Sequence, residues 1–108
     1  MPNNGNGSGK NNGNGGKNGL LLTDFELDVM NNLWNRGKAS ASRIQMDMIR
    51  NGLMYAYPSV YSVLRKFTRT GICKFHQSGY ISTFSPQKTR DQIAEAWIRH
   101  LEQKIFGS

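Results

Sequence analysis

The chain has 108 residues, enough for one small domain, and its 14 Lys and Arg outnumber its 7 Asp and Glu, giving a formal net charge of +7. This charge favours an anionic partner, nucleic acid ahead of an anionic membrane surface, because no strongly basic amphipathic helix is present. The single cysteine, Cys73, excludes an intramolecular disulfide and a zinc site built on several cysteines. We expect it to be a small buried strand residue rather than a redox switch.

The first nineteen residues are rich in Asn and Gly, and after Met1 and Pro2 they contain no apolar side chain that can enter a core. We expect this segment, residues 1–19, to be disordered. It lacks the apolar centre of a secretory signal, and no other stretch approaches the roughly 20 apolar residues of a membrane span. The sequence therefore predicts a soluble, cytoplasmic protein.

Two helices are expected next. Thr23 and Glu26 have the spacing of a capping box, which begins a helix over residues 24–35. Ser40 can cap a second helix, over residues 41–50, through its hydroxyl. The apolar side chains that recur at helical spacing, and are expected in the core, are Phe25, Val29, Met30, Leu33 and Trp34, followed by Ala41, Ile44, Met48 and Ile49.

A third helix is expected over residues 58–70. Pro58 suits a first helical position and Gly71 suits the residue just past a helix end. One face gathers Val60, Val63, Leu64 and Phe67, and the opposite side carries Ser59, Ser62, Arg65, Lys66 and Arg69. Such a cationic face suits a duplex groove, since arginine forks match guanine edges and phosphate oxygens. An ordinary amphipathic surface helix has the same pattern.

A β-hairpin should follow directly. Residues 72–76 and 80–85 are rich in β-formers, residues 77–79 are typical of a turn, and Pro86 should end the second strand. Helix, helix, short turn, helix and hairpin together predict a winged helix-turn-helix, an α+β fold that is mostly helical. The wing of such a fold lies along the phosphate backbone or in the neighbouring minor groove.

A last helix should begin near Thr89, where Thr89 and Gln92 offer a second capping box, and run to about Ile105. Its broad apolar stripe comprises Ile93, Ala94, Trp97, Ile98, Leu101 and Ile105. A stripe that broad favours contact with a second copy, although it can also cover the back of the core. We therefore expect a DNA-binding domain over residues 20–86 and a dimerisation helix over residues 87–108.

Four segments of the sequence resemble the penicillinase and methicillin-resistance repressor family of winged-helix regulators, which also includes copper-responsive repressors. The matching segments are LTDFELDVMNNLW at residues 22–34, AYPSVYSVLRKFTRTGI at 56–72, FSP at 84–86 and IFGS at 105–108. The resemblance implies a dimeric transcriptional repressor that binds an inverted-repeat operator, with helix 58–70 of each subunit in the major groove.

The sequence departs from this family at three points. Leu27 stands where tryptophan is usual, and Tyr80 stands where an arginine is common in the wing. Typical members continue beyond the equivalent of Ser108 into helices that contain most of the dimer interface and the segment cut during induction. We therefore expect a weaker dimer formed through the last helix and an induction mechanism other than cleavage.

The candidate DNA contacts come from three elements. They are Ser40, Arg43, Ser59, Tyr61, Ser62, Arg65, Lys66, Arg69, Lys74 and His76, with Gln77 and Ser78 as further wing candidates. Helix capping is the simpler role for Ser40, and solvation is the alternative role for the cations. The candidate dimer contacts are Ile93, Trp97, Ile98, Leu101 and Ile105.

Catalysis is not expected, because the sequence shows no nucleophile with a base, no paired carboxylates and no phosphate loop. His76 and His100 lack a metal-ligand spacing, so we expect neither a metal nor a cofactor. The function predicted is sequence-specific transcriptional repression on double-stranded DNA by a homodimer, without a membrane partner. A winged-helix adaptor for protein interactions and a non-specific architectural DNA binder are the alternatives.

Overall fold

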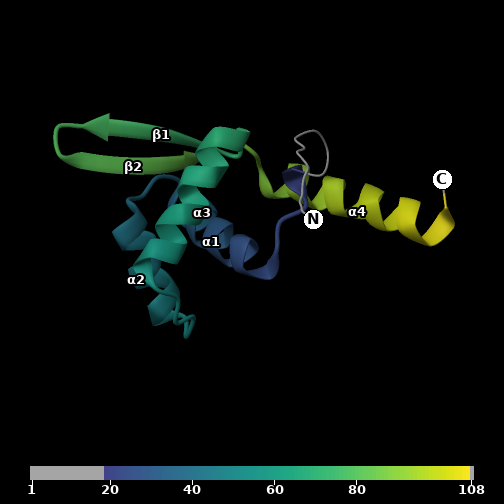
Figure 1. Cartoon of the computed structure of the whole chain (residues 1–108), viewed down its shortest axis with the longest axis horizontal. Helices are drawn as coiled ribbons and strands as arrows, with labels where there is room; N and C mark the ends of the chain where they lie inside the picture. Colours follow the sequence, from purple (N-terminus) through teal and green to yellow (C-terminus); the bar gives the residue numbers. More distant parts are fainter. Residues whose placement is uncertain (1–18, 108) are drawn as a thin grey trace, which may run out of the picture. The chain divides into compact units, whose positions relative to one another are not determined.

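The computed structural model describes residues 19–107, so the predicted disordered tail, apart from Gly19, lies outside the described residues. The elements in order are α1 (Asp24–Arg36), α2 (Ala41–Arg50), α3 (Tyr57–Thr70), β1 (Cys73–Ser78), β2 (Ile81–Pro86) and α4 (Arg90–Phe106) (Figure 1). This order of helices and strands confirms the predicted α+β class. The described chain forms two compact units: residues 23–90, and residues 19–22 together with 91–107.

The first two helices begin at the residues that the sequence indicated. The Thr23 hydroxyl accepts a hydrogen bond from the Glu26 N–H at 3.2 Å, and a Glu26 carboxylate oxygen accepts one from the Thr23 N–H at 2.9 Å. The Ser40 hydroxyl accepts a hydrogen bond from the Arg43 N–H at 3.1 Å. These bonds satisfy backbone donors that a helix start otherwise leaves open. α2 has the predicted bounds, and α1 continues one residue further, to Arg36.

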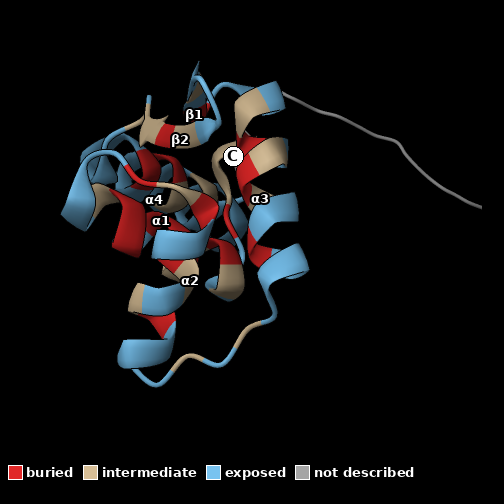
Figure 2. Cartoon of the chain, turned by 90° about the vertical axis from the view of Figure 1, so that its left-hand side faces the viewer, coloured by how far each residue is buried: buried red, intermediate tan, exposed pale blue. Residues whose placement is uncertain are grey.

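The core of residues 23–90 lies among α1, α2, α3 and the hairpin, and Figure 2 shows buried residues on the inner sides of the three helices. Its fully buried side chains include Val29, Met30, Leu33, Ile44, Met48, Val60, Leu64, Phe67, Ile72 and Phe84. The prediction for Ile49 is wrong, since this side chain is 41% exposed. Ile44 and Met48 are four residues apart and share the buried side of α2, whereas Ile49 is turned about 100° away from Met48.

The hairpin is longer than predicted. β1 and β2 pair antiparallel from Cys73 opposite Pro86 to Ser78 opposite Ile81, which leaves Gly79 and Tyr80 as a two-residue connection. Gly79 has a φ of 61°, a left-handed conformation that favours glycine and permits so tight a turn. The predicted three-residue turn is therefore wrong, and pairing extends further toward the tip. Pro86 is the last residue of β2 rather than its stop.

One residue outside the two-stranded sheet, Ala39, also pairs with β2. The Ala39 N–H donates to the Phe84 carbonyl at 3.0 Å, and the Phe84 N–H donates to the Ala39 carbonyl at 2.8 Å. The sequence predicted only a connection between α1 and α2 at residues 38–40. A bridge of one residue has no periodicity, so the pattern of the sequence cannot reveal it. The bridge ties β2 to the start of α2.

The second unit consists mainly of α4. Ile93 and Ala96 are 2% and 6% exposed, and Leu22 is also buried. The large apolar side chains that remain exposed on this helix are Ile98, Leu101, Ile105 and Phe106. None of the helices among residues 19–107 is long and apolar enough to cross a membrane.

Candidate nucleic-acid interface

Helix α3 presents one side to solvent because its other side is fixed in the core. Tyr57 takes the first helical position and Pro58 the second, one place later than predicted, which costs no hydrogen bond because N–H groups of the first turn have no helical partner. Gly71 ends the helix with a φ of 84°. Val60, Leu64 and Phe67 are fully buried, while Ser59, Ser62, Lys66 and Arg69 are exposed. The predicted division into two faces is confirmed for these residues, whereas Val63 and Arg65, predicted on opposite faces, are both half-buried.

Arg65 connects α3 to the wing. Its guanidinium lies over the ring of Phe75 in β1, 4.9 Å from the ring centroid. A cation in this position is attracted by the negative face of the aromatic ring. Arg69, one turn further along, is exposed at the end of α3. The two arginines therefore differ: one is braced against the hairpin and the other extends into solvent.

Lys66 has a partner that the sequence did not suggest. Its ammonium donates to the Glu26 carboxylate at 2.7 Å, joining α3 to the start of α1 across 40 residues of sequence. Burial raises the pKa of Glu26, but the hydrogen bonds from Lys66 and Thr23 outweigh it, and the resulting pKa lies below the usual value. The lysine side chain remains 52% exposed. Lys66 therefore has a structural role whether or not it also meets DNA.

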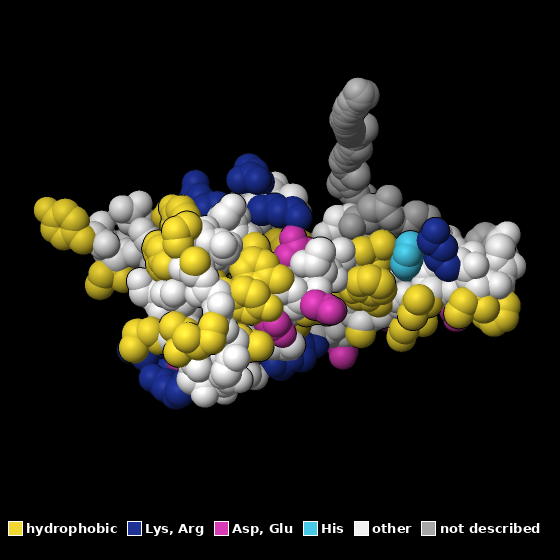
Figure 3. Space-filling model, turned by 60° about the horizontal axis from the view of Figure 1, so that its bottom comes forward, with side chains coloured by type: hydrophobic (Ala, Val, Ile, Leu, Met, Phe, Trp, Pro, Cys, Tyr) yellow, Lys and Arg dark blue, Asp and Glu magenta, His cyan; other side chains and the backbone are white. Residues whose placement is uncertain are grey.

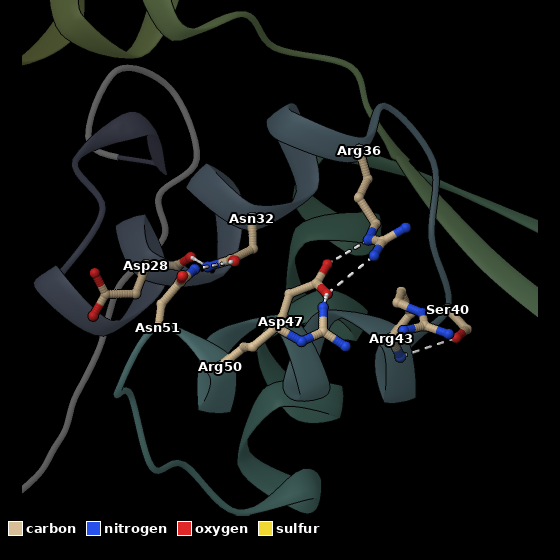
Figure 4. Close-up of polar contacts among 8 residues, drawn as sticks. All are labelled: Asp28, Asn32, Arg36, Ser40, Arg43, Asp47, Arg50 and Asn51. Atoms are coloured by element: carbon tan, nitrogen blue, oxygen red, sulfur yellow. Dashed lines mark hydrogen bonds and ion pairs between the residues drawn. The ribbon is translucent and has the colours of Figure 1, made fainter.

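The start of α2 places Ser40 and Arg43 beside each other, and the arginine guanidinium has no hydrogen bond within the described part of the chain. Its neighbours are engaged, as Figure 4 shows: Asp47 lies between Arg36 and Arg50. Asp47 accepts from Arg36 through both oxygens and from Arg50 at 3.2 Å. The hydrogen bonds from Arg36 hold the pKa of Asp47 below its usual value.

The wing candidates lie along β1. Lys74 is exposed and pairs with Ser85 in the strand register, close to the base of the hairpin. A ring nitrogen of His76 lies 3.2 Å from the Ser85 hydroxyl, across the strands. The Gln77 amide donates to the Gly79 carbonyl at 3.4 Å, within the turn region. Of these side chains, Lys74 alone brings a permanent positive charge.

A recess joins the starts of α2 and α3 to the hairpin. Its lining residues are Ser40, Ala41, Ser42, Tyr57, Tyr61, Tyr80, Ile81, Ser82 and Phe84. The rings of Tyr57 and Tyr61 stack with centroids 6.0 Å apart, and Tyr61 meets Phe84 edge to face at 6.4 Å. The structure thus brings two predicted contacts, Ser40 and Tyr61, to one place. Sequence reasoning missed Tyr57, although its spacing of four residues from Tyr61 puts both rings on one side of a helix.

Cys73 and the histidines form no metal site. Among residues 19–107 there is no group of three His, Cys, Asp or Glu side chains placed to hold a metal ion. Cys73 is buried, its Sγ lies 3.6 Å from the Met30 sulfur, and burial raises its pKa to about 12. The prediction of a buried strand cysteine is confirmed.

Three helices followed by a hairpin, with the third helix exposing hydroxyl and cationic side chains, define a winged-helix protein of the DNA-binding class. The solution structure of the DNA-binding domain of the repressor BlaI has a similar fold, with a TM-score of 0.59 and 15% sequence identity over 68% of this chain and 88% of that one. The model of the penicillinase repressor family matches residues 22–108. The chain belongs to the penicillinase repressor family.

Family membership confirms the resemblance noted in the sequence, and it makes the chain a DNA-binding repressor rather than an enzyme. No curated protein sequence shows significant similarity to the chain. The identity to the BlaI domain is low, so that likeness supports the fold alone.

Proposed function

We propose that the chain is a sequence-specific cytoplasmic repressor that binds an inverted-repeat operator as a homodimer, with α3 of each subunit in the major groove. The observation that supports this most directly is the orientation of α3. Burial of Val60, Leu64 and Phe67 fixes the helix, so that Ser59 and Ser62 face outward on its first two turns. An exposed helix of this kind is what a major groove admits.

The side chains divide by the part of DNA that they suit. Ser59, Tyr61 and Ser62 carry short or planar polar groups on the first half of α3, and such groups suit base edges. The cations at the margins suit phosphates, which position the protein without reading sequence. These cations are Arg43 at the start of α2, Arg65 and Arg69 on α3, and Lys74 on β1.

The start of α2 offers phosphate a further contact, because its N–H groups and helix dipole favour an anion there. Ser40 caps this helix and lines the same recess as Tyr61. His76 and Lys66 are weaker candidates, since each already contacts another side chain, Ser85 and Glu26 respectively. Lys66 supports binding mainly by holding α3 to α1.

Residues 87–108 supply the dimer contact in this proposal. Ile98, Leu101 and Ile105 are exposed at intervals of three and four residues, so they form one stripe along α4. Ile93 is already buried and Trp97 half-buried within the chain, which leaves them less surface for a partner. A two-fold operator requires a two-fold protein, and a second copy of this stripe is self-complementary.

The experiment begins with duplexes selected from a random pool by the full chain, which are then compared with random duplex at one salt concentration. We expect Ser62→Ala to weaken binding to the selected duplex more than to random duplex, because it removes a base contact. Arg69→Ala should weaken both equally and lower the salt slope by about one, as loss of a phosphate contact does. Arg99→Ala, an equal change of charge on exposed α4, is the control.

Two outcomes contradict the proposal in different ways. Equal affinity of the chain for selected and random duplexes indicates an architectural DNA binder. Unchanged binding by both α3 variants means that α3 does not face DNA, and then the protein-interaction interpretation gains.

A further inference from the structure

The free end of the β1–β2 hairpin is apolar. Tyr80 is fully exposed and Ile81 is 65% exposed, and they are adjacent in the chain. Figure 3 shows hydrophobic side chains at this end of the hairpin, furthest to the left, with Lys and Arg side chains further away. Single exposed apolar residues are ordinary on a protein surface, but two large neighbours at the tip of a hairpin form a small continuous apolar surface.

The positive charge of the hairpin lies at its other end. Lys74 is the only Lys or Arg of β1 and β2, and it pairs with Ser85, whereas Ser78 and Ile81 are the last pair before the turn. Four residues of strand separate Lys74 from Ser78, which is about 13 Å. The hairpin therefore places a phosphate-binding group near its base and uncharged side chains at its tip.

The turn itself does not require these residues. Gly79, with its φ of 61°, meets the conformational demand of the two-residue connection. A polar residue at position 80 would therefore expose less apolar surface to water than tyrosine does. The exposure of Tyr80 shows that its ring is not packed into the described part of the chain. Fold stability therefore does not explain the apolar tip.

The surroundings of the tip indicate what covers it. Tyr80 and Ile81 line the same recess as Tyr57 and Tyr61 of α3, so the tip and the outward side of α3 adjoin one surface. In the proposed binding mode, with α3 in the major groove, this shared surface brings the hairpin tip toward the neighbouring minor groove. Lys74 on β1 and Arg65 of α3, whose guanidinium lies over the Phe75 ring of β1, bring positive charge to the same two elements and favour an anionic partner there.

We propose that Tyr80 and Ile81 form an uncharged wedge that enters the minor groove beside the groove bound by α3 and favours flexible pyrimidine–purine steps there. Apolar side chains in a minor groove partly unstack a base step, and such steps unstack most readily. This inference rests on the proposed function and adds a specificity element to it. A cationic wing has the opposite preference, since narrow A-tract grooves attract arginine.

The test uses the selected duplex in two versions, with either a TA step or an A-tract in the flank that the wing reaches. The wild-type chain should prefer the TA version by about tenfold, because the TA step costs less to unstack than a step of the A-tract. Tyr80→Ala should lose this preference by weakening binding to the TA version alone. Tyr80→Arg should shift the preference to the A-tract and steepen the salt dependence. Met46→Ala, which removes another exposed apolar side chain, is the control.

A second readout reports the base step directly: 2-aminopurine placed at the TA step should brighten on binding of the wild-type chain and not of Tyr80→Ala. Unchanged affinity, flank preference and fluorescence in Tyr80→Ala overturn the wedge, while an effect of Ser62→Ala in the same assay keeps the α3 proposal intact. If Tyr80→Ala instead reduces self-association, or binding to anionic phospholipid vesicles, the tip contacts protein or lipid and the wedge is also overturned.

Discussion

The pair of Glu26 and Lys66 shows how one carboxylate supports two elements. Glu26 closes the capping box of α1 and accepts the Lys66 ammonium, so it holds the start of α1 and the middle of α3 together. A surface residue can cap a helix or pair with a lysine, but Glu26 does both while it is only 7% exposed. Without its hydrogen bonds, a charge this buried destabilises the fold.

We therefore expect folding stability to depend on the charge of Glu26. Its folded pKa is lowered from the usual 4.5, so its contribution is present above pH 4.5 and is lost as the pH falls through the folded pKa. Glu26→Gln should retain the cap and lower the free energy of unfolding at pH 7 by about 1 kcal/mol, a value discounted for the half-exposed lysine.

Urea unfolding followed by circular dichroism at pH 7 and pH 3 measures this difference, which should shrink in acid. Glu95→Gln, which alters an exposed carboxylate on α4, is the control and should leave stability almost unchanged at both values. An equal deficit of Glu26→Gln at both pH values would show that packing, rather than charge, is the cause.

At the scale of elements, the helix starts could be predicted from the sequence more accurately than the pairing of the strands. Thr23 and Ser40 are residue types that favour helix starts, and in the structure both side chains accept a hydrogen bond from a first-turn N–H group. The hairpin register was misjudged because Gly79 permits a turn of two residues where three were expected. Ala39 was missed altogether, since a single bridging residue leaves no pattern.

The candidate interface shows the same limit. The outward side of α3 follows from a helical period of 3.6 residues, so Ser59, Ser62 and Arg69 could be placed from the sequence. The partners of Arg65 and Lys66 could not, because Phe75 lies on a strand and Glu26 is 40 residues away. Such contacts depend on how elements pack, which no local spacing records.

The contact between Arg65 and Phe75 should make α3 and the wing one rigid element. Arg65→Lys keeps the charge but loses the planar group that stacks on the ring, so we expect a loss of roughly 0.5 to 1 kcal/mol and weaker hydrogen-exchange protection of the β1 amides. Arg69→Lys is the matched control, since no ring lies under the guanidinium of Arg69 within residues 19–107. Equal protection in both variants would mean that the hairpin is held by Phe84 and the Ala39 bridge alone.

At the scale of the whole molecule, the proposed DNA contacts and the proposed dimer contacts lie in different units. The proposed DNA contacts all lie within residues 23–90, and the exposed apolar stripe lies on α4. Binding to one half-site therefore depends on the first unit, and recognition of a two-half-site operator depends on both. This separation allows each function to be removed without the other.

Leu101→Glu tests the separation, because it places a charge in the middle of the stripe formed by Ile98, Leu101 and Ile105. We expect the wild-type chain to change from monomer to dimer across a concentration series in sedimentation, and the variant to stay monomeric. Binding to a single half-site should be unchanged. Binding to a two-half-site duplex should fall by about 100-fold, since two linked sites gain affinity through effective concentration rather than new contacts.

Gln103→Glu adds the same charge on the opposite side of α4, about 160° from Leu101 at 100° per residue, and should leave both assembly and DNA binding as in the wild type. The comparison separates loss of the stripe from a general effect of negative charge near DNA. If the wild-type chain is a monomer at every concentration, free and on the two-half-site duplex, α4 does not join two copies. Each half-site must then be bound independently by one chain.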